Sequence, residues 1–288
     1  MLHSTTTYGL QSSFSVEESI RLVVKAGFPA VDISLCKDNA FVLADDYRET
    51  AAKLRAVAES CGIIINQTHA PFSYYERYTG EIVPNMARYV EFSGLLGAKT
   101  VIVHPIQYAV EHYKHSEQLF KENMEFYSSL APVAKKFGVK VGIENMWQRR
   151  PVSNIIDDSA CADPAEFIRY YDTLNDPEAF TVCIDIGHIP LCGRDPSYVI
   201  RQLGSRIGAL HVHDVDFVED THTLPGLGKI DWDSVCRALA DVGYKGDFTL
   251  ESHRFVEYYD AALIPAALRF MSEVASHYAA LVESYKAN

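Results

Sequence analysis

Side chains that can bind a metal or transfer a proton recur at the ends of short apolar segments. Six such segments each supply one of these side chains, namely His69, His104, Glu144, Asp185, His211 and Glu251. If they converge in space, their carboxylates repel one another unless a cation or a shared proton neutralises them. Carboxylates combined with imidazole suit a divalent ion such as Mn, Co, Mg or Zn, and not Cu(I) or an iron–sulfur cluster. The pattern therefore predicts a divalent-metal site.

Each of these residues also has a purely structural explanation. An Asp that follows a strand, such as Asp185, is commonly the N-cap of the next helix. A single His beside a strand is commonly a hydrogen-bonded core residue. A lone Glu at an apolar strand end, as in GIEN or TLES, is harder to explain because burying an unpaired carboxylate is costly. None of these explanations accounts for the repetition in six consecutive segments.

The segments that carry these residues belong to a set of seven short apolar runs with the length and composition of buried parallel strands. The seven are AVDISL from Ala30, IIINQT from Ile63, TVIVHP from Thr100, KVGIEN from Lys140, FTVCID from Phe180, ALHVHD from Ala209 and FTLESH from Phe248. LHSTTTYG near the start makes eight. Stretches with helical spacing lie between them, and five of these end at Gly27, Gly62, Gly97, Gly138 and Gly243. A last amphipathic helix is expected from about 261 to 286.

This alternation predicts one α/β domain over residues 1–288, built as a closed (β/α)8 barrel and not as an open doubly wound sheet. The length suits a single barrel, because α/β barrels commonly need about 250 residues. In a barrel the carboxyl ends of the strands converge on the axis. The six strand-end side chains would then face one another.

Charge and composition narrow the classes of partner. The chain has 26 Lys and Arg against 38 Asp and Glu, a formal net charge of −12, which disfavours nucleic acid and anionic lipid surfaces as partners. The six cysteines are scattered without a CxxC pair, which favours a reducing compartment. The first residues lack the pattern of a signal peptide, and no apolar run of about 18 residues occurs. A cytoplasmic protein without a membrane span is expected.

The ordered strand ends resemble those of the xylose isomerase-like barrels, a superfamily that includes sugar isomerases, epimerases and endonuclease IV. The resemblance covers essentially the whole chain and rests on THAP, VIVHP, GIEN, CIDIGH, LHVHD, PGLGKIDW and LESH in that order. In the ketose 3-epimerases of this family one metal ion is held by four side chains, which correspond here to Glu144, Asp185, His211 and Glu251. By the same resemblance His188 and His213 lie beside the substrate.

The resemblance also implies a reaction. A hydroxy-ketone that chelates the ion has an acidified α-hydrogen, because the metal stabilises the enediolate that forms when the proton leaves. Glu144 and Glu251 are the candidates for removing the proton from one face and returning it to the other, as in an epimerase. Return of the proton to the neighbouring carbon would give an isomerase. The implied substrate is a small carbohydrate, with no organic cofactor and with a homodimer or homotetramer as the expected assembly.

Two alternatives stay open. Endonuclease IV binds three zinc ions through nine ligands, and the matching positions are His69, His104, Glu144, Asp185, His188, His211, Asp220, His222 and Glu251. A multi-zinc phosphodiesterase, or another metal-dependent hydrolase or lyase, would use these residues as additional metal ligands. The negative net charge argues against DNA as the substrate. The other alternative is a binding barrel without catalysis, in which no acid or base faces the substrate pocket.

Overall fold

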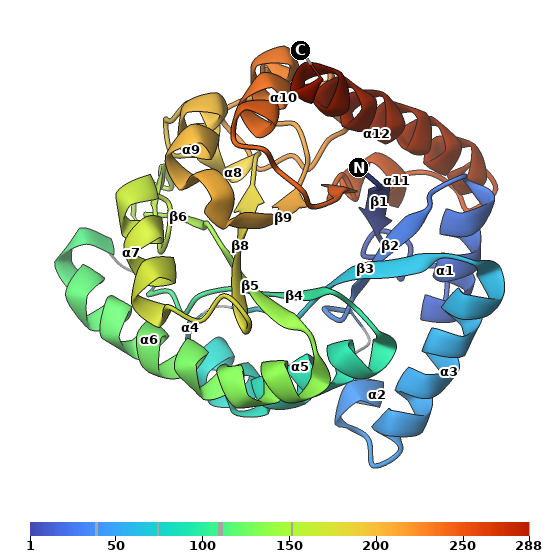
Figure 1. The fold of residues 1–288 in the computed structure, drawn as a ribbon, viewed down its shortest axis with the longest axis horizontal. Helices are drawn as coiled ribbons and strands as arrows, with labels where there is room; N and C mark the ends of the chain where they lie inside the picture. The colour runs from blue at the N-terminus through green and yellow to red at the C-terminus, as the bar shows by residue number, and fades with distance from the viewer. Residues whose placement is uncertain (38–39, 74, 109–111, 151, 288) are drawn as a thin grey trace.

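The computed structural model describes residues 1–37, 40–73, 75–108, 112–150 and 152–287. Eight parallel strands surround a common axis in the order β10-β1-β2-β3-β4-β5-β8-β9 (Figure 1). They are β1 (His3–Thr6), β2 (Ala30–Ser34), β3 (Ile64–His69), β4 (Thr100–Val103), β5 (Lys140–Glu144), β8 (Phe180–Asp185), β9 (Ile207–His211) and β10 (Phe248–Leu250). Each coincides with one of the eight predicted segments, so the predicted (β/α)8 barrel is confirmed.

The barrel closes between its last two strands through a short contact. Val212 and Leu250 form an isolated parallel bridge beyond the end of β9. The backbone N–H of Val212 donates to the carbonyl of Thr249 at 2.9 Å, and the N–H of Glu251 donates to the carbonyl of Val212 at 2.9 Å. The closure therefore lies beside Glu251, one of the predicted site residues.

An outer ring of helices covers the barrel (Figure 1). The longer ones are α1 (Val16–Lys25), α3 (Tyr47–Cys61), α5 (Met86–Leu96), α6 (His112–Phe137), α7 (Pro164–Leu174), α9 (Pro196–Leu203), α10 (Trp232–Asp241) and α12 (Ile264–Lys286). Short helices α2 (Ala40–Leu43), α4 (Tyr75–Arg77), α8 (His188–Leu191) and α11 (Arg254–Glu257) lie between them. The five glycines predicted to end helices all have positive φ. The last helix begins at Ile264 and not at about 261, with Pro265 in its first turn, where proline is well tolerated.

The core has two layers. The large apolar cluster fills the space between the sheet and the helices, with Tyr127, Phe167 and Phe180 among its fully buried side chains. A second, small cluster contains only Ile102, Cys183 and Ala209. These residues precede site residues by two positions on β4, β8 and β9, so strand alternation places them inside the barrel. On these three strands the interior is thus apolar below the site residues.

The pairing of β2 with β3 contains a register shift. Val31 pairs with Ile65 and Asp32 pairs with Gln67, so that Asn66 is an extra residue on β3. Asn66 lies inside the barrel, where its side-chain amide donates to the hydroxyls of Ser4 and Thr249 at 3.0 Å. An extra residue of this kind is a β-bulge, in which the added residue is left unpaired in the ladder.

One element was not predicted, an antiparallel hairpin of β6 (Trp147–Arg149) and β7 (Ile156–Asp158). It follows directly after β5 and brings Trp147 and Arg149 to the mouth of the barrel. Both strands have only three residues, and their sequences WQR and IDD contain no apolar run. The guanidinium of Arg194 supports the hairpin by donating to both carboxylate oxygens of Asp158 at 2.6 Å.

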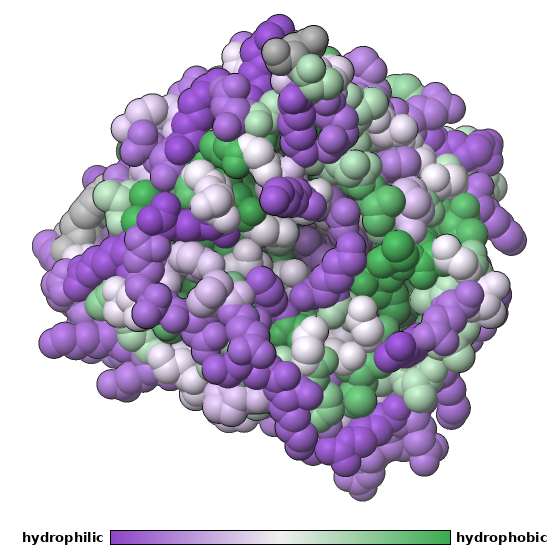
Figure 2. Space-filling view, in the orientation of Figure 1, coloured by the Kyte–Doolittle hydropathy of each residue, from purple (hydrophilic) through white to green (hydrophobic). Residues whose placement is uncertain are grey.

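The surface is largely polar. Hydrophilic residues cover most of the face seen in Figure 2, in the orientation of Figure 1. Among the described residues, no helix combines the length and the apolarity that a membrane span requires.

Candidate metal centre

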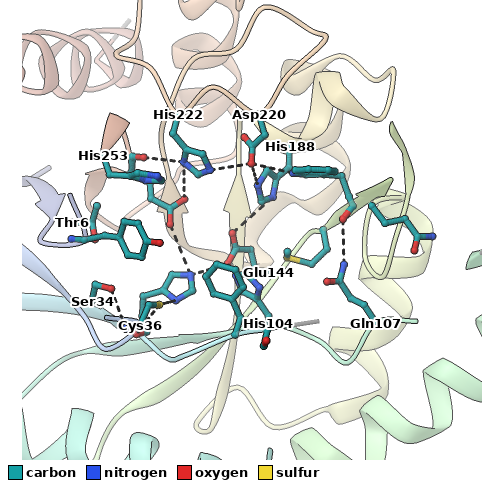
Figure 3. Close-up of a pocket in the computed structure, with 18 of the residues that line it drawn as sticks. Thr6, Ser34, Cys36, His104, Gln107, Glu144, His188, Asp220, His222 and His253 are labelled. Atoms are coloured by element: carbon teal, nitrogen blue, oxygen red, sulfur yellow. Dashed lines mark hydrogen bonds and ion pairs between the residues drawn. The ribbon is translucent and has the colours of Figure 1, made fainter. Parts of the chain in front are cut away.

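The predicted site residues meet at the carboxyl end of the barrel, around a cavity of about 680 Å³. Seven of them line the cavity, namely His69, His104, Glu144, His188, Asp220, His222 and Glu251. Asp185, His211 and His213 lie beneath it and are fully buried. Figure 3 shows Asp220 between the rings of His222 and His188, with Glu144 near the centre of the group. The convergence expected of a barrel is therefore present.

The four residues that the resemblance assigns to one metal ion form a compact group. Glu144, Asp185, His211 and Glu251 each offer one ligand atom, and these atoms lie within 4.8 Å of one another. The Nδ1 atom of His211 is 3.0 Å from Oε1 of Glu144 and 3.5 Å from Oε2 of Glu251. These residues come from the ends of β5, β8, β9 and β10. Each of these strands is the neighbour of the next in the barrel, and the pairing of neighbouring strands sets the spacing of the four side chains.

Burial makes this group electrostatically demanding. Burial alone would raise the pKa of Glu144, but the imidazoles of His211 and His104 outweigh it and hold that pKa well below its usual value. Burial would lower the pKa of His211, and the carboxylates of Glu251 and Glu144 instead raise it to about 9. Likewise burial opposes ionisation of Asp185, yet His188 and His213 lower its pKa to about 2. Positive charge is needed among these carboxylates, and a divalent ion is one source of it.

The donor atoms fit a divalent ion. His211 is fully buried and its Nε2 has no hydrogen-bond partner among the described residues, while its Nδ1 faces two carboxylates. Buried imidazole and carboxylate atoms without a complete set of partners are costly unless a cation satisfies them. A mixed set of three carboxylates and one imidazole matches Mn, Zn, Co or Mg.

Asp185 is not the N-cap of the next helix, because Gly187 has that position, but its carboxylate contacts the start of that helix. Its Oδ1 accepts a hydrogen bond from the backbone N–H of His188 at 2.9 Å, at the first residue of α8. Asn145 fixes the backbone of Asp185 from both sides, accepting from its N–H at 2.7 Å and donating to its carbonyl at 2.9 Å. The carbonyl of Asn145 also lies 2.9 Å from Nδ1 of His188. Asn145 thereby orients two site residues and was not singled out from the sequence.

A second group of possible ligands lies beside the first and contains His188, His213, Asp220 and His222. The Oδ2 atom of Asp220 is 3.0 Å from Nε2 of His222 and 3.6 Å from Nε2 of His188. The rings of His213 and His222 stack with their centroids 4.0 Å apart. His213 connects the two groups, because its Nε2 is also 3.0 Å from Oδ1 of Asp185.

His69 and His104 complete the set on the side of β3 and β4. The Nε2 atom of His104 is 3.1 Å from Oε2 of Glu144, and the Nε2 atom of His69 is 3.6 Å from the same oxygen. His69, Glu144 and His211 also form a third group of possible ligands. Glu144 is therefore shared between two groups, as a bridging carboxylate would be.

Asp214 holds the loop that carries Asp220 and His222. Its carboxylate is fully buried and accepts four hydrogen bonds, from the backbone N–H groups of Val215, Gly226 and Ile230 and from the indole N–H of Trp232, at 2.8 to 3.1 Å. The loop from 215 to 231 is thereby fixed at both ends and in its middle. Asp231, at the end of this loop, is the N-cap of α10 and accepts from the backbone N–H of Ser234.

Two further residues of the cavity were not predicted. The ring of His253 packs on that of His222 with a centroid distance of 4.2 Å, and burial together with His222 and His213 holds its pKa well below the usual value. The Sγ atom of Cys36 lies 3.4 Å from Nδ1 of His69. Cys36 follows the second predicted strand by two positions, which is the signal that could have identified it.

The model of the xylose isomerase-like TIM barrel family matches residues 20–274. An uncharacterized protein of Methanocaldococcus jannaschii is 28% identical over 192 residues, which are 64% of this chain and 63% of that protein. An inosose dehydratase of Bacillus cereus is 32% identical over 98 residues, which are 28% of this chain and 33% of that protein. The chain thus matches less than two thirds of the length of each of these two relatives.

Solved structures with the same fold include a sugar epimerase and a zinc-bound protein. The D-psicose 3-epimerase of Clostridium cellulolyticum H10, solved with D-tagatose, has a TM-score of 0.73 at 19% identity, covering 96% of this chain and 99% of that one. The IOLI protein with a bound zinc atom has a TM-score of 0.72 at 18% identity, covering 99% of both chains. At these identities the likeness shows the fold.

Proposed function

Because the chain belongs to the xylose isomerase-like TIM barrel family, we propose that it is a divalent-metal-dependent isomerase or epimerase of a small carbohydrate. The observation that carries this proposal is the compact group of Glu144, Asp185, His211 and Glu251 at the floor of the cavity. The zinc in the IOLI structure and the sugar in the epimerase structure support it by analogy.

The four residues would hold the metal ion. When bound, such an ion supplies Lewis-acid stabilisation of the negative charge that develops on a substrate oxygen as the neighbouring carbon loses its proton. Asp185 and His211, both fully buried, contribute ligand atoms without access to the cavity. Their role is therefore confined to holding the ion.

Glu144 and Glu251 both line the cavity and are the proposed acid/base pair. They stand on β5 and β10, which are separated by β8 and β9, and they approach the floor of the cavity from different sides. One carboxylate can remove the proton next to the carbonyl, and the other can return a proton to the opposite face. His188 and His222 line the same cavity and are placed to hold substrate hydroxyls.

The walls of the cavity suit a sugar. Aromatic side chains line it, namely Tyr8, Phe72, Tyr75, Tyr108 and Trp147. Polar groups among them, including Gln107 and Arg149, provide hydrogen bonds to hydroxyl groups. A cavity with apolar walls and a few convergent polar groups is the usual form of a small-molecule site.

The test combines metal content with proton exchange. Protein purified without chelator is expected to hold about one divalent ion per chain, bound by Glu144, Asp185, His211 and Glu251. Ketoses incubated with it in deuterium oxide are expected to take up deuterium at the carbon next to the carbonyl, as seen by proton NMR. Glu251→Gln is expected to retain the fold and lower exchange by about 100-fold or more. Unchanged exchange in this variant would overturn the proposed role of Glu251.

A hydrolase or lyase is the second candidate, because His188, His213, Asp220 and His222 form a separate group of possible ligands. The named relatives do not favour a hydrolase, but one of them is an inosose dehydratase, which is a lyase by its name. Two or three tightly held ions per chain, with one lost in His222→Ala, would favour this candidate. Loss of a substrate hydroxyl as water, without isomerisation, would favour a dehydratase.

A further inference from the structure

A second cavity of about 270 Å³ opens at the other end of the barrel, around the amino ends of β4, β9 and β10. Its walls include Thr100, Gly208 and Gly246. Ala209 also borders it, and this residue belongs to the small apolar cluster with Ile102 and Cys183. That cluster lies between the second cavity and the metal centre, since His211 follows Ala209 by two positions along β9. The two cavities are therefore separate.

Two buried amides border this second cavity, and one of them has an unpaired atom. Asn66 is 3% exposed and Gln67 is 2% exposed. The amide nitrogen of Asn66 is satisfied by two hydroxyls, but its Oδ1 has no hydrogen-bond partner among the described residues. Nε2 of Gln67 makes no hydrogen bond of regular geometry, and the group that it interacts with is the buried carboxylate of Asp32, its partner in the ladder. A buried acceptor without a partner costs free energy. An occupant that donates a hydrogen bond to Asn66 would recover it.

The opening of this cavity is locally positive in a chain with a formal net charge of −12. Lys99 and Lys245 line it together with one carboxylate, that of Asp247. The Nζ atom of Lys99 is 3.5 Å from Oδ2 of Asp247, which is a long contact. Lys245 has no ion pair with any described residue. One positive charge is therefore left over at the rim.

We propose that this cavity is a binding site for a small oxyanion that also carries a hydroxyl group, such as hydrogen phosphate or a hydroxycarboxylate. The anionic oxygens would accept from the two lysines, and the hydroxyl would donate to Oδ1 of Asn66. A cavity of this size accepts a small ligand and excludes polymers. The site is independent of the proposed isomerase reaction, because it lies at the other end of the barrel.

The test uses inorganic phosphate as the probe on the purified full chain. Calorimetric titration at constant ionic strength is expected to show saturable binding of one phosphate at this site, with a rise in the thermal unfolding midpoint. Sulfate is the matched probe, because it has the same shape and no proton to donate to Asn66. We expect sulfate to bind about tenfold more weakly than hydrogen phosphate, the effect of one lost hydrogen bond to a buried partner. For a hydroxycarboxylate, glycolate is compared with acetate. Glycolate is expected to bind more tightly, because acetate has no hydroxyl group to donate to Asn66.

Variants locate the bound anion. Lys99→Ala combined with Lys245→Ala is expected to weaken phosphate binding by about tenfold or more, and both side chains are exposed, so the fold is retained. Arg149→Ala, at the mouth of the first cavity, is the control and is expected to leave binding unchanged. Loss of binding in Arg149→Ala alone would place the anion at the metal centre and overturn the proposal. The absence of saturable phosphate binding would also overturn the proposal, because water would then be the occupant of the second cavity.

Discussion

The two ends of this barrel are built from the same strands and have opposite chemistry. Along β3, Gln67 borders the lower cavity and His69 the upper one. Along β9, Ala209 borders the lower cavity and His211 lies buried beneath the upper one. The carboxyl end gathers titratable side chains, whereas the amino end has amides and a hydroxyl with two lysines at its rim. A shift of two residues along a strand, about 6.6 Å, thus separates a site for reaction from a site that can only bind.

The comparison shows where each end gains or loses stability. At the carboxyl end, buried carboxylates are tolerated because imidazoles face them. Burial raises the pKa of Glu144, but His211 and His104 outweigh burial and hold this pKa well below its usual value. At the amino end the unpaired group, Oδ1 of Asn66, is neutral, so its cost is smaller. The reactive end is therefore the one that a change of charge disturbs most.

The largest expected effect comes from removing one charge at the carboxyl end. Glu144→Gln keeps the size of the side chain and removes a carboxylate shared by two ligand groups. We expect isomerisation or epimerisation to fall by about 1,000-fold and metal content to fall below one ion per chain. Glu91→Gln, in an ion pair with Arg48 on the helical ring, is the control and should retain both. Phosphate binding at the amino end should be the same in both variants; a change there would break the separation of the ends.

A smaller effect is expected from the anchor of the upper loop. Asp214→Asn places an NH2 group where one carboxylate oxygen accepts two hydrogen bonds, so that donors face donors. We expect a loss of about 2–4 kcal/mol in the free energy of unfolding, measured by urea denaturation, together with weaker substrate binding through Asp220 and His222. Asp216→Asn, an exposed loop residue that accepts from Val218 and Glu219, should cost much less. Equal losses in the two variants would contradict the role of Asp214.

Asp32, inside the barrel between the two ends, predicts a pH dependence. Its carboxyl is fully buried, and burial raises its pKa from 3.8 to about 6, although His211 and His69 oppose the shift. The folded state binds this proton more tightly than the unfolded state, so its contribution to stability is present below about pH 4 and is lost as pH rises through about 6. The loss approaches about 3 kcal/mol.

Asp32→Asn removes this titration. In metal-free protein we expect the stability of the variant relative to the wild type to rise by about 2–3 kcal/mol between pH 4 and pH 7. Asp172→Asn is the control. The pKa of this exposed carboxyl is lowered, mainly by its hydrogen bond with Arg206, so removing the Asp172 carboxyl should not make the variant more stable relative to the wild type as pH rises. A flat difference between Asp32→Asn and wild type across this range would show that the Asp32 carboxyl is ionised at little cost.

The smallest effect is expected at the boundary between the ends. Ile102→Val removes the Cδ1 atom that lies 2.7 Å from the position a Cβ would take on Gly142. We expect a loss of about 1 kcal/mol in unfolding free energy and no change beyond twofold in metal or phosphate binding. A change in both metal binding and phosphate binding would mean that the small apolar cluster couples the two cavities.

Much of the barrel was predictable because its signals are local. Most of the strands have apolar side chains on consecutive positions, although β1 (HSTT) is polar, and their carboxyl ends lead to polar residues in or beneath one cavity. Asp220 and His222 could be assigned to the site only through the resemblance. They lie in a loop without a strand or helix pattern, and this loop is positioned by the hydrogen bonds to Asp214. Cys36, Asn145 and His253 were missed, since their contacts are formed between distant segments. The roles of the predicted residues in metal binding and catalysis stay predictions.

The extra residue on β3 has a further consequence for how the fold can change over time. Asn66 is unpaired in the ladder, and beyond it Thr68 faces helix α5, where its hydroxyl donates to Ser93, and His69 faces the cavity. A descendant lacking Asn66 could pair Val31 with Ile65 and Asp32 with Gln67 without a bulge, and Thr68 and His69 would keep their present faces. The extra residue therefore adds one inward amide to the barrel without displacing His69 from the cavity. Loss of Asn66 should alter the amino end of the barrel more than the carboxyl end.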